Sequence, residues 1–218
     1  PSTEEELKAL AALDKGNYKY KVEDYFAKPK ASAFQLSPNG KYLSYMEKDD
    51  AGKRHVYVKE IATGTVKRAK GYGWINDERL FFVMDKGGNE NYHLFASNID
   101  GSNTRDLTPF DGVKASILNM LKEQKDYMII SMNKNNPQIF EPYKLNVVTG
   151  ELTQLYENKD AANPIQGYEF DKDGELRGYS RLVNGIESEL YYKDLATGEF
   201  RLLKKTHWDD TFGVIAFN

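Results

Sequence analysis

The amino-acid sequence predicts an all-β fold built from a repeated four-stranded antiparallel unit. Two classes of tight turn alternate along the chain. The first class comprises Asn39-Gly40, Asn76-Asp77, Lys125-Asp126 and Asp173-Gly174, and the second comprises Thr63-Gly64, Asp100-Gly101, Thr149-Gly150 and Thr197-Gly198. The second residue of each first-class turn lies 24 residues before the glycine of the next second-class turn, four times over. Glycine, asparagine and aspartate are typical of hairpins, whose central residues need positive φ.

Each repeat contains four short runs of strand-forming residues, joined by these turns and by one polar loop. In the first repeat the runs are Ala33–Leu36, Tyr42–Met46, His55–Ile61 and Thr65–Ala69. Four antiparallel strands in every ~40–50 residues are typical of a propeller blade, whereas a β-sandwich would not alternate two turn classes in register. The sequence therefore predicts a partial β-propeller of about four blades, at about 31–70, 71–110, 113–157 and 165–205.

The two ends of the chain differ from the repeats. Residues 1–17 are predicted to form a short helical segment, because its leucines fall on one face at i, i+3 and i+6. Residues 211–218 match the first strand of a repeat but lack the turn that should follow, so we expect a truncated fifth blade there. The partial propeller domain is thus expected over 18–218, and the chain is expected to be part of a longer protein.

The composition excludes several classes of protein. The chain has 218 residues, a formal net charge of −3 and no cysteine, which excludes a disulfide scaffold and a cysteine-based zinc site. It has no dense run of Lys and Arg, so there is no electrostatic footprint for nucleic acid or an anionic membrane. No apolar run approaches the ~18–20 residues of a membrane span. We expect no nucleic-acid partner, no membrane partner, no metal and no cofactor.

The chain offers little that points to catalysis. The pentapeptide Gly-x-Ser-x-Gly, which places a nucleophilic serine on a strand-to-helix elbow, does not occur in this sequence. His55 and His93 occupy the same place in their repeats, which favours a structural role for both. His207 stands near two aspartates, a pattern that is more often solvated than metal-binding. No catalytic residue is therefore predicted.

The polar loop of the second repeat contains the candidate interface residues. Asn89, Glu90 and Asn91 are predicted to face the propeller channel or a partner domain. The alternative is a hairpin loop closed by bonds from Asp85 and Asn91 side chains to the backbone. Trp208, outside the regular strands, is the candidate for an exposed ligand-binding anchor.

Three segments together resemble a known family. They are "DYFAKPKASAFQLSPNGKYLSYM", "DKGGNENYHLFASNIDGSNTRDLTPFDGVKA" and "ISMNKNNPQIFEPYKLNVVTGEL", at 24–46, 85–115 and 130–152. They are similar to the propeller of bacterial prolyl oligopeptidase-family serine peptidases, particularly the acylaminoacyl-peptidase and dipeptidyl-peptidase-like members. The "SPNGKYLSY" element of the first segment is shared with TolB-like propellers, so the second segment carries most of the assignment.

The resemblance implies a role beside a catalytic domain. In that family the propeller precedes a C-terminal α/β-hydrolase domain that holds the catalytic triad, and it restricts entry to short peptides. We therefore expect a non-catalytic propeller portion of such a peptidase, with peptides and the hydrolase domain as its partners. Many bacterial relatives are exported, which favours the periplasm or the outside of the cell.

Two alternatives remain open from the sequence. The chain could instead be a free-standing TolB-like module that binds a protein partner, or a ligand-binding propeller that uses Trp208. An incomplete propeller also leaves an unpaired edge strand, which is a template for pairing with another chain. We expect either an open arc that forms a homodimer by edge pairing, or four blades closed into a strained ring.

Overall fold

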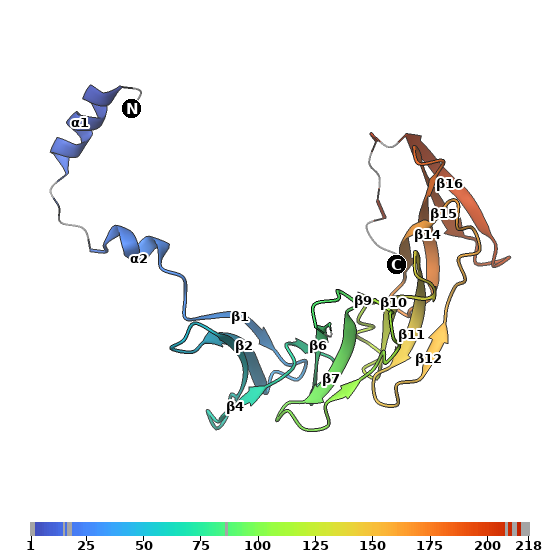
Figure 1. Cartoon of the computed structure of the whole chain (residues 1–218), viewed down its shortest axis with the longest axis horizontal. Coiled ribbons are helices and arrows are strands. Elements are labelled where there is room, and N and C mark those ends of the chain that lie inside the picture. Colours follow the sequence, from blue (N-terminus) through green and yellow to red (C-terminus); the bar gives the residue numbers. More distant parts are fainter. Residues whose placement is uncertain are drawn as a thin grey trace.

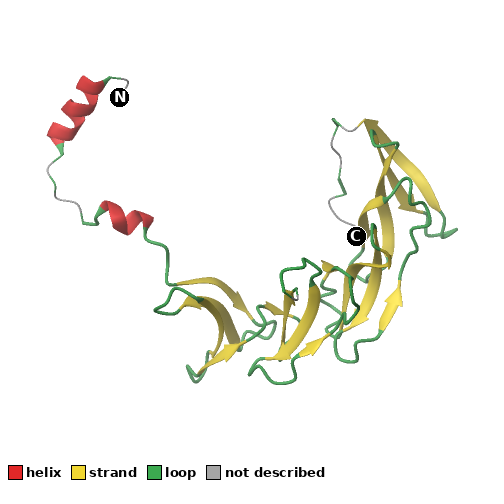
Figure 2. Ribbon diagram, viewed as in Figure 1, coloured by secondary structure: helices red, strands yellow, loops and turns green. Residues whose placement is uncertain are grey.

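The computed structural model describes residues 3–14, 16, 19–85, 87–207, 209–210 and 213–214. They form four antiparallel sheets of four strands each, and in every sheet the strands lie side by side in chain order. The sheets stand next to one another along an open arc (Figure 1). Figure 2 shows that the two helices lie apart from the sheets, at the N-terminal end. The predicted all-β fold of four four-stranded blades is confirmed.

We call the four sheets blades 1 to 4. Blade 1 contains β1 (Ala31–Leu36), β2 (Tyr42–Lys48), β3 (Arg54–Glu60) and β4 (Val66–Ala69). Blade 2 contains β5 (Gly73–Trp74), β6 (Arg79–Met84), β7 (His93–Asn98) and β8 (Arg105–Asp106). Blade 3 contains β9 (Ala115–Asn119), β10 (Tyr127–Asn136), β11 (Ile139–Asn146) and β12 (Leu152–Gln154). Blade 4 contains β13 (Ile165–Phe170), β14 (Leu176–Val183), β15 (Glu187–Lys193) and β16 (Phe200–His207).

The hairpin turns have the backbone geometry that their residues predict. Six glycines of the two turn classes have φ between 68° and 84°, a region that a side chain with a Cβ rarely adopts. They are Gly40, Gly64, Gly101, Gly150, Gly174 and Gly198. The turn at Asn76-Asp77 has no glycine, and the Asn76 side-chain oxygen instead accepts hydrogen bonds from the backbone N–H groups of Glu78 and Arg79, both at 3.0 Å. Turn chemistry thus sets the length of each hairpin.

The N-terminal segment contains two helices where one was predicted. Helix α1 (Glu4–Leu13) is capped by the Thr3 hydroxyl, which accepts a hydrogen bond from the Glu6 N–H at 3.2 Å. Helix α2 (Val22–Phe26) is only five residues long and was not predicted. Its N-terminus is held by Asp24, whose carboxylate accepts the Lys21 N–H at 2.8 Å. A single turn held by one side chain has no hydrophobic period, so a periodicity search misses it.

The main hydrophobic core lies between blades 2 and 3. Leu94 and Ala96 of β7 are fully buried with Ile130 of β10 and Tyr143 and Leu145 of β11. A smaller cluster joins blades 1 and 2, where Val58 of β3 and Ala69 of β4 contact Leu80 of β6. Blades 1, 2 and 3 are therefore held together by apolar side chains between neighbouring sheets.

Two further expectations concern the ends of the chain and the membrane. The predicted truncated fifth blade, 211–218, lies outside the described residues except for Gly213 and Val214. Across the described part of the chain, neither helix has the length and apolar character that crossing a bilayer requires.

Removal of the Ile130 side chain tests the core between blades 2 and 3. We expect Ile130→Ala to lower the free energy of unfolding by about 2–5 kcal/mol, because a fully buried side chain is replaced by a cavity. Urea denaturation followed by circular dichroism measures this loss. Leu195→Ala is the control: Leu195 is 65% exposed, so its loss should stay within about 0.5 kcal/mol. Equal losses in the two variants would contradict a core at this interface.

Candidate functional site

One position in the third strand of every blade carries a polar side chain, and an aromatic ring follows two residues later. The four pairs are His55 and Tyr57, His93 and Phe95, Glu141 and Tyr143, and Glu189 and Tyr191. Side chains two residues apart on a strand project from the same side of the sheet. We call this side of each blade its front side, and the opposite side its back side.

In blades 1 and 2 the polar residue is a histidine bonded to an aspartate of its own blade. A His55 ring nitrogen lies 2.8 Å from the Asp49 carboxylate, and the Arg68 guanidinium donates to the other ring nitrogen at 2.7 Å. His93 is 5% exposed and lies 2.8 Å from Asp106. The hydrogen bond to His55 contributes most to holding the pKa of Asp49 below its usual value. Each histidine is engaged within its blade.

In blade 3 the polar residue is the buried carboxylate of Glu141. It is 3% exposed and accepts hydrogen bonds from the Asn158 N–H at 2.9 Å and the Asn135 amide at 2.7 Å. The Tyr143 hydroxyl lies 3.4 Å from the same carboxylate. Burial, assisted by the negative charge of Glu141, raises the pKa of Tyr143 to about 12. Asn158 belongs to the segment that connects blade 3 to blade 4, so Glu141 anchors this connector.

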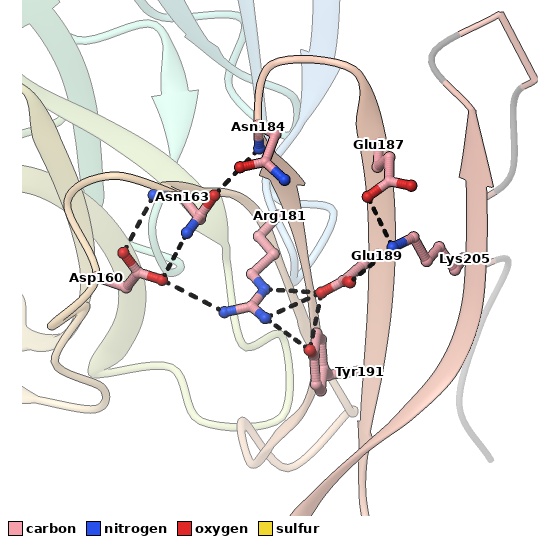
Figure 3. Close-up of polar contacts among 8 residues, drawn as sticks. All are labelled: Asp160, Asn163, Arg181, Asn184, Glu187, Glu189, Tyr191 and Lys205. Atoms are coloured by element: carbon pink, nitrogen blue, oxygen red, sulfur yellow. Dashed lines mark hydrogen bonds and ion pairs between the residues drawn. The ribbon is translucent and has the colours of Figure 1, made fainter.

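In blade 4 the polar residue, Glu189, binds an arginine from the neighbouring strand. Arg181 lies directly opposite Glu189 in the β14–β15 pairing, and its Nη2 is 2.9 Å from the Glu189 carboxylate. The Tyr191 hydroxyl donates to Glu189 at 2.8 Å and accepts from Arg181 at 2.7 Å (Figure 3). Burial alone would raise the pKa of Glu189, but the bonds from Tyr191 and Arg181 outweigh it and hold the pKa below its usual value.

The connector between blades 3 and 4 brings a second carboxylate to the other side of Arg181. Asp160 lies 3.6 Å from the Arg181 guanidinium, and it is fixed by the Asn163 side-chain amide at 3.0 Å (Figure 3). Asn163 in turn accepts the N–H of Asn184, in the β14–β15 loop, at 3.1 Å. The hydrogen bond from Asn163 contributes most to lowering the pKa of Asp160. Arg181 is thus held between two carboxylates from different elements.

Asp160, Asn163 and Arg181 border a cavity of about 470 Å³ between the connector and blade 4. Its wall combines aromatic rings with charged and amide groups, from Leu155, Tyr156, Glu157, Asn158, Lys159, Asp160, Asn163, Ile165, Tyr179 and Arg181. Tyr156 and Tyr179 form the aromatic part, with ring centroids 5.5 Å apart. The buried side-chain nitrogen of Asn158 has no hydrogen-bond partner in the described structure. A cavity with aromatic walls and a few fixed polar groups is typical of a binding site.

The predicted interface residues lie away from this cavity. Asn89, Glu90 and Asn91 form part of the loop between β6 and β7, and none of them lines it. The Asp85 carboxylate accepts the Glu90 N–H and the Asn89 side chain accepts the Asn91 N–H, both at 3.0 Å. The loop is therefore closed by side chains, as the alternative interpretation expected, although Asn89 takes the place given to Asn91. Whether these residues face a channel or a partner domain stays a prediction.

Strand direction places this loop and the cavity at the same end of the blades. In an antiparallel meander, the turn from the second to the third strand lies at the end where the fourth strand finishes. The loop at 85–92 is such a turn, and the connector at 155–164 leaves the fourth strand of blade 3. In blade 4, Asn184 of the β14–β15 loop contacts Asn163 of the connector, so a loop of this kind and the connector lie close together there too.

The two other candidates from the sequence, His207 and Trp208, do not form a binding site among the described residues. His207 lies 2.6 Å from Asp209, and the described residues hold no cluster of three or more histidines or carboxylates suited to a metal. Trp208, the candidate ligand anchor, lies outside the described residues.

Sequence reasoning missed Arg181, Asp160 and Glu189. The repeat contained a signal for Glu141 and Glu189, because both occupy the third-strand position of His55 and His93. No sequence signal marks Asp160. It lies close to Arg181 because the connector folds back toward β14.

Comparisons with known proteins point to peptidases. The chain is 29% identical over 162 residues to dipeptidyl aminopeptidase BIII of Pseudoxanthomonas mexicana, covering 70% of this chain and 23% of that protein. It is 27% identical over 205 residues to dipeptidyl peptidase family member 6 of Caenorhabditis elegans, covering 85% of this chain and 26% of that protein. The resemblance to prolyl oligopeptidase-family peptidases is confirmed. The chain spans about a quarter of the length of these curated relatives.

Other comparisons add little detail. No protein-family model matches the chain. A putative TolB of Agrobacterium tumefaciens aligns with a TM-score of 0.46 at 10% identity, covering 80% of this chain and 65% of that one. A puromycin-hydrolyzing peptidase of Mycobacterium tuberculosis aligns with a TM-score of 0.45 at 13% identity, covering 81% and 29%.

Glu189→Gln tests the carboxylate that binds Arg181. At pH 7 we expect it to lower the free energy of unfolding by about 1–3 kcal/mol, because a charged hydrogen bond is lost. The folded pKa of Glu189 lies below the unfolded value of about 4.3, so its stabilisation is present above that pH and is lost as the pH falls through the folded pKa. The difference between the two proteins should therefore shrink below about pH 4 in urea denaturation.

Glu187→Gln is the matched control for this experiment. Glu187 lies two residues earlier on β15 and pairs with Lys205 at 2.7 Å, but its side chain is more exposed, 32% against 10% for Glu189. An exposed ion pair contributes little, so this variant should lose less than about 1 kcal/mol. A pH-independent difference for Glu189→Gln would contradict the assigned role of its charge.

Proposed function

We propose that this chain is the non-catalytic propeller portion of a serine peptidase and that it gates the access of peptides to an α/β-hydrolase domain. The observation that carries the proposal is the similarity to two dipeptidyl peptidases, which extends over 70% and 85% of the chain. The four propeller-like blades support it, because they supply a rigid scaffold whose loops can restrict entry to a neighbouring domain.

In this proposal, the peptide and the hydrolase domain lie at the end of the blades that carries the cavity. Arg181, Asp160 and the amide of Asn158 offer polar groups there, and Tyr156 and Tyr179 offer apolar surface. Asn89, Glu90 and Asn91 lie at the same end of blade 2, as strand direction requires. In this proposal they contact the partner domain or border the peptide's path.

Edge pairing between two copies stays a prediction. The outer strand of blade 4, β16, has eight residues, whereas β4, β8 and β12 have four, two and three. A long outer strand favours pairing, but Lys204, Lys205 and an extra residue at Leu203 in the β15–β16 register oppose it.

The chain alone is expected to have no peptidase activity. Its 218 residues contain no Gly-x-Ser-x-Gly, so no nucleophilic serine of the hydrolase type can attack a peptide bond. Chromogenic aminoacyl and prolyl substrates measure this. Turnover that a serine-directed inhibitor abolishes would show that the chain carries its own catalytic site.

A chimera tests the gating role. We would replace the matched segment of the Pseudoxanthomonas enzyme by this chain and measure kcat/KM for a short and a long peptide. We expect the short peptide to be preferred, and we expect alanine at Asn89, Glu90 and Asn91 to reduce that preference at least ~3-fold, because side chains that narrow the path are removed.

Alanine at Asp100, Ser102 and Asn103 is the control, since these polar residues form the turn at the opposite end of blade 2. The preference should not change in this variant. Equal effects of the two triple variants would overturn the assignment of 89–91, and a chimera without any size preference would overturn gating.

A further inference from the structure

Two arginines lie at the end of the blades opposite to the cavity. Arg79 is the first residue of β6 and Arg105 is the first residue of β8, and each follows a tight turn. Their partners on β7 are Asn98 and Ala96, which lie two residues apart and share one side of the strand. Both arginine side chains therefore project from the back side of blade 2, the side that packs on blade 3.

Arg79 carries a charge that no described residue neutralises. Its Nε and Nη2 atoms are buried and have no hydrogen-bond partner among the described residues, whereas Nη1 is not buried. Burial, assisted by the positive charge of Arg105, lowers the pKa of the Arg79 guanidinium. A buried cation without a counter-charge costs free energy, and buried polar groups in folded proteins are normally satisfied by a partner, which can be an ion.

Arg105 connects this place to blade 3 through the turn between β11 and β12. Its Nη1 donates a hydrogen bond to the Val148 carbonyl oxygen at 3.3 Å. A Cβ on Gly150 would lie only 2.8 Å from the Arg105 Nη2, so the missing side chain lets the guanidinium lie against the turn. Arg105 is exposed, and within the described part of the chain it forms no ion pair with a carboxylate. Its other N–H groups are therefore open to a ligand.

The two carboxylates nearest to Arg79 in the chain do not neutralise it. Asp77, in the turn between β5 and β6, pairs instead with Lys125 of blade 3, with 3.4 Å between Oδ2 and Nζ. Glu78 is exposed and forms no ion pair among the described residues. Arg79 and Arg105 thus share one side of a blade, and the described structure supplies neither with an anion.

We propose that Arg79 and Arg105 bind a dianionic oxyanion of the phosphate type, which links blade 2 to the β11–β12 turn of blade 3. A guanidinium presents its N–H groups in a planar fork that matches the oxygens of such an anion. Two guanidinium groups supply two positive charges, which favours a dianion over a carboxylate with a single charge. Oxygens bound at Nη1 and Nη2 of Arg79 supply the acceptors and the counter-charge that this side chain lacks.

Thermal unfolding in the presence of inorganic phosphate tests the site. We expect about 20 mM sodium phosphate to raise the melting temperature by at least ~2 °C above that in sodium chloride of equal ionic strength, because a ligand that binds the folded state stabilises it. Phosphate also stabilises folded proteins because it is excluded from their surface. Variants of single arginines separate this general effect from binding at the site.

Arg79→Met removes the buried cation, and Arg54→Met is the matched control. Arg54 is exposed at the start of β3, at the end of blade 1 that lies away from the proposed site. The gain in melting temperature from phosphate should fall to the general effect in Arg79→Met and stay complete in Arg54→Met. Without phosphate, Arg79→Met should melt no lower than the original protein, because a buried charge without a counter-charge is removed. Equal gains in all three proteins would mean surface exclusion only and would overturn the proposal.

A phosphate titration followed by phosphorus NMR measures the affinity directly. We expect saturable binding that Arg105→Gln weakens at least ~10-fold, because one of the two charged donors is lost. Arg105 is exposed, so this variant should fold normally, and it decides the question if Arg79→Met does not fold. Acetate should compete with phosphate at least ~10-fold more weakly than sulfate does, because it carries one charge. Unsaturable binding, an unchanged affinity in Arg105→Gln, or acetate equal to sulfate would each overturn the proposal.

Discussion

The structure depends on the packing of the front sides of blades 2 and 3, each against the back side of the blade before it. A four-stranded meander cannot bury an apolar surface alone, and its neighbour supplies the missing half of the core. Between blades 2 and 3 this contact removes Ile130, Tyr143, Leu94 and Ala96 from water. The same kind of contact joins blades 1 and 2, where Leu80 is buried against Val58.

The polar site forms where this packing is interrupted. Between blades 3 and 4 the connector at 155–164 enters the interface, and it brings backbone and side-chain groups that need partners. Glu141 and Glu189 supply them from equivalent strand positions, one to the N–H of Asn158 and the other to Arg181. The carboxylate at this strand position therefore binds the connector in blade 3 and orients the Arg181 guanidinium in blade 4.

Much of the fold could be predicted from the sequence because hairpin turns are local. Gly40 and Gly64 are glycines at turn positions that need positive φ, so the sequence itself marks these turns. The number of residues between them gives the length of the strands that they join. Helix α2 escaped prediction because its single turn is held by Asp24 and has no hydrophobic period. The pairing of Arg181 with Asp160 escaped because it joins residues 21 apart through a connector without regular structure.

By itself the sequence determined the four blades, their strand order and the resemblance to prolyl oligopeptidase-family peptidases, since these rest on turns and motifs that lie within short stretches of chain. Only the tertiary structure decided which residues form the polar cavity and which side chains are buried between blades. Tyr57 and Tyr143 occupy the same place in their repeats, yet only Tyr143 is fully buried. The difference is physical: Tyr143 lies in the core between blades 2 and 3, and no local pattern encodes which side chains of another blade it meets.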